Sequence, residues 1–178
     1  MELYIPLGIF LLVLLWVLGN YNAFVRLRNH IRESWNNIDV QLKRRYDLIP
    51  NLVATVKGYA AHEKDLLERV IEARNQAKAK NGRAKYEKPM VQSLKQMLAL
   101  SEAYPDLKAD KHYMALQEEL VDTEDRIAAA RRFYNANVRD YNTRREAVPS
   151  NVIAAFFSFR EKKFWEVDEA SHRRAPRV

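Results

Sequence analysis

An uncharged run near the N-terminus constrains this chain more than any other feature of its sequence. From Leu3 to Val25 the chain has 23 consecutive residues without a formal charge, and the densest part of the run reads LYIPLGIFLLVLLWVLG. As an α-helix the run extends over about 34 Å, which is enough to cross a hydrocarbon core of ~30 Å. Pro6 falls in the first turn, where proline is tolerated. We therefore expect a transmembrane helix at the start of the chain.

Two other kinds of segment have a similar composition, namely a cleaved signal peptide and the core helix of a soluble protein. A signal peptide begins with Lys or Arg and ends at an A-x-A-like cleavage site. Here the only charge before the run is that of Glu2, and no such site follows the run. The sequence therefore favours an uncleaved anchor over residues 1–25.

The basic residues predict the orientation of this anchor. None precedes the run, whereas six follow it within twenty residues: Arg26, Arg28, Arg32, Lys43, Arg44 and Arg45. By the positive-inside rule, the N-terminus lies outside and the bulk of the chain is cytoplasmic. All 30 Lys and Arg residues and 22 of the 23 acidic residues follow position 25, which gives this part a formal charge of +8. Such a charge beside a bilayer suits anionic lipid headgroups, whereas no nucleic-acid recognition motif accompanies it.

After the anchor, apolar residues recur with the period of an α-helix. Ten of them between Phe24 and Val56 are separated by about 3.6 residues on average, which predicts an amphipathic helix continuous with the anchor. Pro50 interrupts this pattern. Because its ring removes one backbone donor, we expect a kink there and treat Pro50 as a candidate hinge. The pattern resumes at Leu66 and fades near Lys80.

Local signals divide the rest of the chain. Residues 81–88, which contain Asn-Gly-Arg, form the clearest linker. A short helix is expected to end near Tyr104, because the residue before Pro105 is pushed out of helical geometry. Asp110 is the candidate N-cap of a last long helix, which stops before Pro149.

These segments predict an all-α fold class, since 4 Gly and 6 Pro leave few turns for a β fold. We expect an N-terminal transmembrane helix that continues into a long antiparallel helical hairpin or bundle. The expected domains are the anchor at 1–25, a cytoplasmic helical bundle at 26–147, and an amphipathic aromatic segment with a polar tail at 148–178. One hairpin or three chain reversals would both return residues 150–165 to the bilayer.

The segment that returns has the pattern of a surface-binding helix. Its apolar face is expected to comprise Val152, Ile153, Phe156 and Phe157, and three basic residues follow. Together with Arg26 and Arg28, this face is a candidate membrane-surface contact. The alternative is a helix that caps the end of the bundle.

Few residues have the types and spacing that catalysis requires. Without cysteine, the chain cannot form disulfides, iron–sulfur clusters or thiolate metal sites. The Glu-x-x-His motif from Glu169 to His172 lies in the polar tail, so a di-iron centre is not expected. The four glycines form no phosphate loop. We therefore predict no enzyme activity, no metal, no cofactor and no small-molecule substrate.

Polar side chains embedded in apolar helix faces form the candidate site. They are Asp39, Arg44, Arg45, Asp47 and Asn51 in the first long helix, and Arg131, Tyr134, Asn135, Tyr141 and Asn142 in the last. In the last helix the two tyrosines are seven residues apart, as are the two asparagines, so each pair shares a face. Two interpretations stay open. Either the tyrosines fill the core with their hydroxyls paired at its rim, or an interhelical polar network fixes register or builds an assembly surface.

Several blocks of the sequence resemble the LemA family. The longest is YNAFVRLRNHIRESWNNIDVQLKRRYDLIPNLVATVKGYAAHE at residues 21–63. Later blocks are AYPDLKAD at 103–110, EDRIAAARRFYNANVRDYNT at 124–143, and residues 149–159. The resemblance implies a bacterial inner-membrane protein with one transmembrane helix, a cytoplasmic helical bundle and no known catalytic residues. Because family members are often encoded near membrane metalloproteases, it also implies such a protease as a partner.

The predicted function is that of a self-associating, non-catalytic scaffold or adaptor at the inner membrane. Its expected partners are the lipid bilayer and further copies of itself, and nucleic acid is not among them. Self-association is expected because long amphipathic helices have more apolar face than one antiparallel neighbour covers. The alternative is a regulatory partner of a membrane protease or sensor system.

Overall fold

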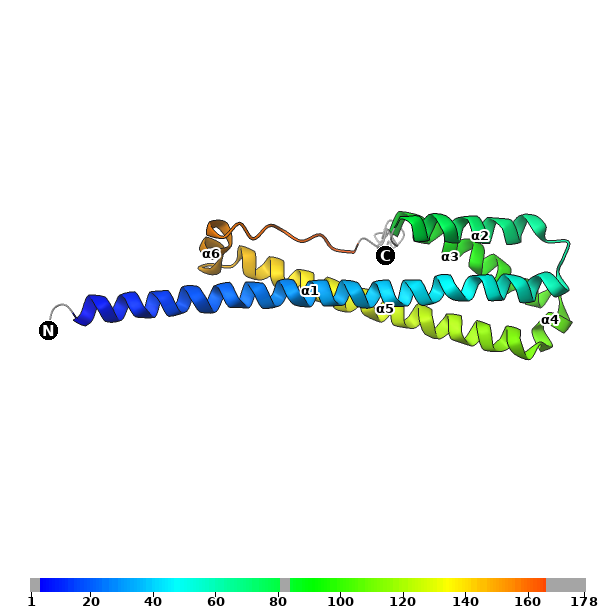
Figure 1. Ribbon diagram of the computed structural model, residues 1–178, viewed down its shortest axis with the longest axis horizontal. Coiled ribbons are helices and arrows are strands. Elements are labelled where there is room, and N and C mark those ends of the chain that lie inside the picture. The colour runs from blue at the N-terminus through cyan, green and yellow to red at the C-terminus, as the bar shows by residue number, and fades with distance from the viewer. Residues whose placement is uncertain (1–3, 81–83, 166–178) are drawn as a thin grey trace, which may run out of the picture. The chain divides into compact units, whose positions relative to one another are not determined.

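The computed structural model describes residues 4–80 and 84–165, and within these ranges the chain is helical without strands, as predicted (Figure 1). The elements are α1 (Tyr4–Tyr59), α2 (Lys64–Ala79), α3 (Ala84–Ala99), a 3₁₀ turn η1 (Leu100–Glu102), α4 (Pro105–Ala109), α5 (Lys111–Glu146) and α6 (Ser150–Phe156). They form two compact units. The described part of unit 1 comprises residues 4–36 and 131–165, and that of unit 2 comprises residues 37–80 and 84–130.

Unit 2 is a helical bundle whose core follows the apolar period of the sequence. The second half of α1 and the first half of α5 contribute buried side chains mostly at intervals of three, four or seven residues, as a helix with one buried face requires. Those of α1 include Ile38, Leu42, Tyr46, Ile49, Leu52, Val53 and Val56, and those of α5 are Tyr113, Leu120, Thr123 and Ile127. Within α2 the buried residues are Leu66, Leu67, Val70 and Ala77, and within α3 they include Met90, Leu94 and Met97. The chain reverses after α1, after α2 and across η1–α4, so the three-reversal arrangement holds rather than the single hairpin.

Two local expectations are confirmed at the ends of α5. Asp110 caps this helix, because its Oδ1 accepts a hydrogen bond of 2.7 Å from the backbone N–H of Tyr113. The helix ends at Glu146, three residues before Pro149. Short-range signals were sufficient at both ends, since capping and proline sterics act within one turn.

The predicted linker at 81–88 is too long, because α3 begins at Ala84 and continues through Pro89. The buried face of Met90, Leu94 and Met97 continues back by one turn to Glu87, which is also buried. This burial outweighs the single backbone donor that proline removes. At Pro50 too the helix continues, and α1 ends only at Tyr59.

Unit 1 has its own core, formed by α1, α5, α6 and the extended chain after α6. The buried cluster comprises Phe24, Ile31, Val138, Tyr141, Ile153, Ala154 and Phe159. Phe24 and Phe159 stack with ring centroids 4.7 Å apart, and Tyr141 meets Phe24 edge-on at 5.9 Å. Aromatic pairs of this kind add about 0.5–1.5 kcal/mol beyond the burial of their area.

The first part of α1 projects apolar side chains that nothing in the described chain covers. An 18-residue stretch of this helix is long and apolar enough to cross a membrane, and only 6% of it is buried. Leu12, for example, is 68% exposed. A core helix of a soluble protein would bury most of such a surface.

Candidate functional site

Residues 159–165, here called the strap, are extended and lie along α5 in unit 1. The strap is held by side chains of α5 rather than by a neighbouring strand. Asn142 donates from Nδ2 to the carbonyl of Lys162 at 2.8 Å, and its Oδ1 accepts from the N–H of Lys162 at 3.0 Å. One side-chain amide thereby pairs both backbone groups of a residue, as a neighbouring strand would.

Asn135 repeats this arrangement one step further along the strap. Its Oδ1 accepts from the N–H of Trp165 at 2.8 Å, and its Nδ2 donates to the carbonyl of Trp165 at 3.3 Å. Seven residues of helix separate the asparagines and rise ~10.5 Å. Three residues of extended chain separate Lys162 from Trp165 and span ~10 Å. The two lengths match, so both amides engage the strap in one register.

Two tyrosine hydroxyls complete the set of contacts. Tyr141 donates to the carbonyl of Arg160 and Tyr134 to that of Lys163, each at 3.0 Å. Burial raises the pKa of both phenols above the usual value near 10, so both remain donors at neutral pH. All four side chains therefore contact the backbone of the strap. The interhelical interpretation had predicted partners on another helix, and for these four residues it is wrong.

Aromatic side chains fix both ends of the strap. Phe159 is buried in the core of unit 1, and Trp165 is buried against Trp35, with ring centroids 5.2 Å apart. The guanidinium of Arg131 lies 5.1 Å from the centre of the Trp165 ring, within range of a cation–π interaction. Between the two ends, the hydrogen bonds from α5 go to the backbone of the strap, and one ion pair joins Arg145 to Glu161 at 3.7 Å.

The candidate residues of the first long helix form a separate group in unit 2. Arg45 is fully buried and pairs with the buried carboxylate of Glu87 on α3 and with Glu124 on α5, the latter at 2.5 Å. The hydroxyl of Tyr46 also donates to Glu87. One arginine therefore connects three helices, and a carboxylate on each neighbour compensates the loss of its hydration.

The other candidates in this group lie at the surface. Arg44 pairs with Glu119 at 3.0 Å while both side chains are about two-fifths exposed, and such a pair contributes little to stability. Asp39, Asp47, Pro50 and Asn51 are exposed. Sequence reasoning missed Glu87, which it placed in the linker. The spacing of Met90, Leu94 and Met97 could have found it, because the same face contains position 87.

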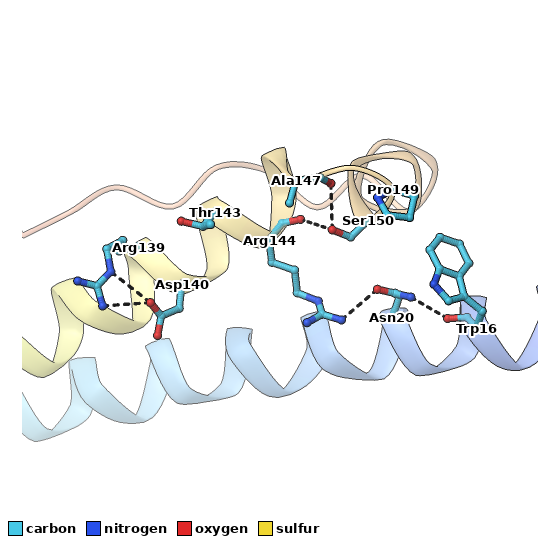
Figure 2. A pocket seen from close by; sticks show the side chains of 9 residues that line it. All are labelled: Trp16, Asn20, Arg139, Asp140, Thr143, Arg144, Ala147, Pro149 and Ser150. Atoms are coloured by element: carbon cyan, nitrogen blue, oxygen red, sulfur yellow. Dashed lines mark hydrogen bonds and ion pairs between the residues drawn. The ribbon is translucent and has the colours of Figure 1, made fainter.

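At the other end of unit 1, α1, α5 and α6 line a wide-open pocket of about 560 Å³. Its lining residues are Trp16, Asn20, Arg139, Asp140, Thr143, Arg144, Ala147, Pro149 and Ser150 (Figure 2). Arg144 extends across it from α5 and donates from Nη2 to Oδ1 of Asn20 at 3.0 Å, and Asn20 donates to the carbonyl of Trp16 at 2.9 Å. The hydroxyl of Ser150 lies 2.7 Å from the carbonyl of Arg144 and joins α6 to the end of α5.

The predicted apolar face of residues 150–157 is divided between the core and the surface. Ile153 is only 5% exposed and packs in the core of unit 1, so its assignment to a membrane-surface contact is wrong. A helix places residues i and i+4 together, so Val152 and Phe156 share the outer face, and Phe156 is 80% exposed. Phe157 rests partly against Tyr21, with centroids 4.9 Å apart. Arg26 and Arg28 are exposed on α1.

In residues 4–80 and 84–165, no group of three His, Cys, Asp or Glu side chains is placed to hold a metal ion. Among the polar features of this part of the chain, the strap contacts, the Arg45 cluster and the pocket at Arg144 contain the candidate residues.

Comparison with known proteins finds relatives among magnetosome proteins and a LemA protein. Magnetosome protein MamQ of Magnetospirillum gryphiswaldense is 24% identical, with 84% of this chain and 65% of MamQ covered. Magnetosome protein MamQ 2 of Paramagnetospirillum magneticum is also 24% identical, with 84% and 66% covered, and Protein LemA of Metamycoplasma hominis is 28% identical, with 84% and 69% covered. The chain thus spans just under two thirds of the length of these MamQ proteins. The LemA family itself matches over residues 34–178, and the chain belongs to the LemA family.

Proposed function

We propose that this protein is a membrane-anchored, self-associating and non-catalytic helical scaffold or adaptor of the bacterial inner membrane. Its N-terminus lies outside, and the bulk of the chain is cytoplasmic. The observation that carries the proposal is the exposed apolar surface at the start of α1, where a span-length stretch is only 6% buried. Such a surface is stable in hydrocarbon and unstable in water.

Contacts within unit 1 support an anchor that stays attached to the chain. Phe24 lies at the end of the uncharged run and belongs to the core of the unit, and Val17 is packed against that core. Trp16 and Asn20 line the pocket with α5 and α6. Cleavage after the uncharged run would remove Trp16, Asn20 and the buried ring of Phe24 from unit 1, and the unit would lose part of its core.

The position of α6 supports contact with the membrane surface. Phe157 packs on Tyr21 within the run, so α6 lies at the level where the anchor leaves the hydrocarbon. Val152 and Phe156 are exposed there. Apolar side chains at this depth enter the headgroup region at little cost, and the basic residues that follow favour anionic lipid.

Exposed apolar side chains on α5 support self-association. Met114 and Val121 are seven residues apart and share one face, and both are more than half exposed. This face belongs to unit 2, which lies outside the proposed span. A second copy of the chain would cover it, as amphipathic helices cover one another in bundles.

The experiment measures the oligomeric state of the full-length protein in detergent by mass photometry. A regular oligomer is expected for the wild type, and Met114→Glu with Val121→Glu is expected to shift it toward monomer. Ala115→Glu, an exposed position on the same helix, is the matched control. A wild-type monomer that co-purifies with a membrane metalloprotease would instead support the regulatory alternative, and release of the protein by alkaline carbonate would refute the anchor.

A further inference from the structure

We propose that the pocket around Arg144 binds the phosphate of an anionic phospholipid in the leaflet on the side of the bulk of the chain. This inference rests on the proposed membrane anchor and adds a ligand to it. Three observations support it, namely the unpaired charge of Arg144, the depth of the pocket along the anchor, and the apolar surface that adjoins it.

Arg144 is a cation without a carboxylate partner in the described part of the chain. Its guanidinium contacts the neutral amide of Asn20 and lies 5.8 Å from the centre of the Phe24 ring. Its Nε is buried and has no hydrogen-bond partner among the described residues. A half-buried arginine usually pairs with an anion, and phosphate oxygens suit the planar arrangement of its donors.

The other charges of the pocket cancel each other. Arg139 donates from Nε and Nη2 to Oδ1 of Asp140, both at 3.2 Å, so this pair adds no net charge (Figure 2). Arg144 therefore leaves the lining with one positive charge. The hydroxyl of Thr143 is a further lining group of the right type for a phosphate oxygen. A pocket of about 560 Å³ has room for a phosphoglycerol headgroup.

If α1 spans the bilayer, the end of the pocket at Asn20 and Arg144 lies nearest to the lipid headgroups. Asn20 is six residues before Arg26, the first charged residue after the run, which corresponds to ~9 Å along the helix. Trp16 lies one turn deeper, ~15 Å along the helix from Arg26, and so belongs to the apolar end of the pocket within the hydrocarbon. The pocket thus extends over about the last three turns of the uncharged run, and its polar end faces the charged region.

The adjoining surface favours a lipid over free phosphate. On α1, Leu15 directly precedes Trp16 and Leu12 lies about one turn below it, and both leucines are more than 60% exposed. Acyl chains attached to a bound phosphate would run along these side chains. A free phosphate ion would gain nothing from them, so the same pocket should hold a phospholipid more tightly.

The test uses the full-length protein in nanodiscs of phosphatidylcholine mixed with phosphatidylglycerol. Native mass spectrometry of the released complexes measures the ratio of phosphatidylglycerol to phosphatidylcholine that stays bound. We expect a ratio above that of the bulk lipid for the wild type and a fall of about tenfold for Arg144→Gln, because a charge-assisted hydrogen bond is lost. Arg132→Gln, an exposed arginine of the same helix, should leave the ratio unchanged.

Each outcome decides the proposal. The proposal is overturned if Arg144→Gln retains the wild-type ratio of bound phosphatidylglycerol to phosphatidylcholine. It is also overturned if Arg132→Gln lowers this ratio equally, because the net charge of the surface and not a specific site would then attract the lipid. The ratio is measured on intact complexes, so a less stable variant still gives a valid result. Inorganic phosphate is added to protein in phosphatidylcholine alone, and equally strong binding there would show that the ligand is a free anion. Wild-type protein that fails to enter nanodiscs would refute the anchor, whereas a negative lipid result with inserted protein leaves the anchor intact.

Discussion

Replacing Asn142 with alanine tests whether side-chain amides hold the strap in place. The variant loses two hydrogen bonds to Lys162, of 2.8 and 3.0 Å. At about 1 kcal/mol for each net hydrogen bond, opening of the strap becomes easier by about 2 kcal/mol. Since 1.4 kcal/mol corresponds to a factor of ten, the N–H of Lys162 should exchange with solvent about 30-fold faster.

The assay is hydrogen–deuterium exchange of the full-length protein in detergent, followed at the amides of Lys162 and Trp165. Both N–H groups donate to an asparagine side chain, so they report directly on the strap. Thr143→Ala, an exposed neighbour on the same helix, is the matched control and should leave both rates unchanged.

The second asparagine gives a sharper test of the same reasoning. If the strap opens as one piece, Asn135→Ala should also speed exchange at Lys162, although it touches only Trp165. In the double variant the two effects on the free energy of opening should then add, because both pairs of hydrogen bonds break in the same opening event. Wild-type exchange at Lys162 in folded Asn142→Ala protein would refute the argument, since burial of the terminal aromatic residues would then suffice.

Three further predictions concern the helices. Arg45→Met should lower the free energy of unfolding by about 3–5 kcal/mol, because it leaves buried carboxylate unpaired, whereas Arg44→Met should cost at most about 1 kcal/mol; chemical denaturation compares the two. Tyr141→Phe should lower the melting temperature more than Tyr134→Phe, because the Tyr141 hydroxyl is the less accessible to water. The hydrogen bond from the backbone N–H of Tyr113 lowers the pKa of Asp110. The Asp110 carboxylate therefore stabilises the fold above pH ~4, and this stabilisation is lost as the pH falls through the lowered pKa. Asp110→Asn keeps a cap acceptor, and its unfolding curves should therefore depend less on pH between about 5 and 2; an equally steep dependence would show that other carboxyls cause it.

Local signals in the sequence predicted the helices well because they act over one or two turns. The cap at Asp110 and the proline after α5 defined that helix, and the apolar period identified the buried face of α1. The predicted beginning of α3 was too late, because the Asn-Gly-Arg turn signal and Pro89 both suggested a linker. Burial against the other helices of unit 2 extends the helix back by more than one turn. The expected helix lengths were compatible with both one hairpin and three chain reversals. Packing between helices that are distant in the sequence decides between these two arrangements.

The candidate site was only partly predictable. The seven-residue spacing of Asn135 and Asn142 was visible, but a helix face looks the same whether a helix or an extended chain covers it. The strap itself has no alternating pattern, because its backbone is paired by side chains some twenty to thirty residues away. Glu87 was missed for a related reason, since its partner Arg45 lies on another helix.

Because the strap is extended, the rate at which a protease cuts it reports how often it detaches from α5. Proteases bind their substrates as extended chains and pair with the backbone groups that the two asparagines occupy here. Cleavage after Lys162 or Lys163 therefore requires the strap to lift first, and its rate follows the fraction of time that the strap is free. Such a cut removes Trp165 and everything after it, so the contacts between α5 and the strap set how fast a protease can cut at these two positions.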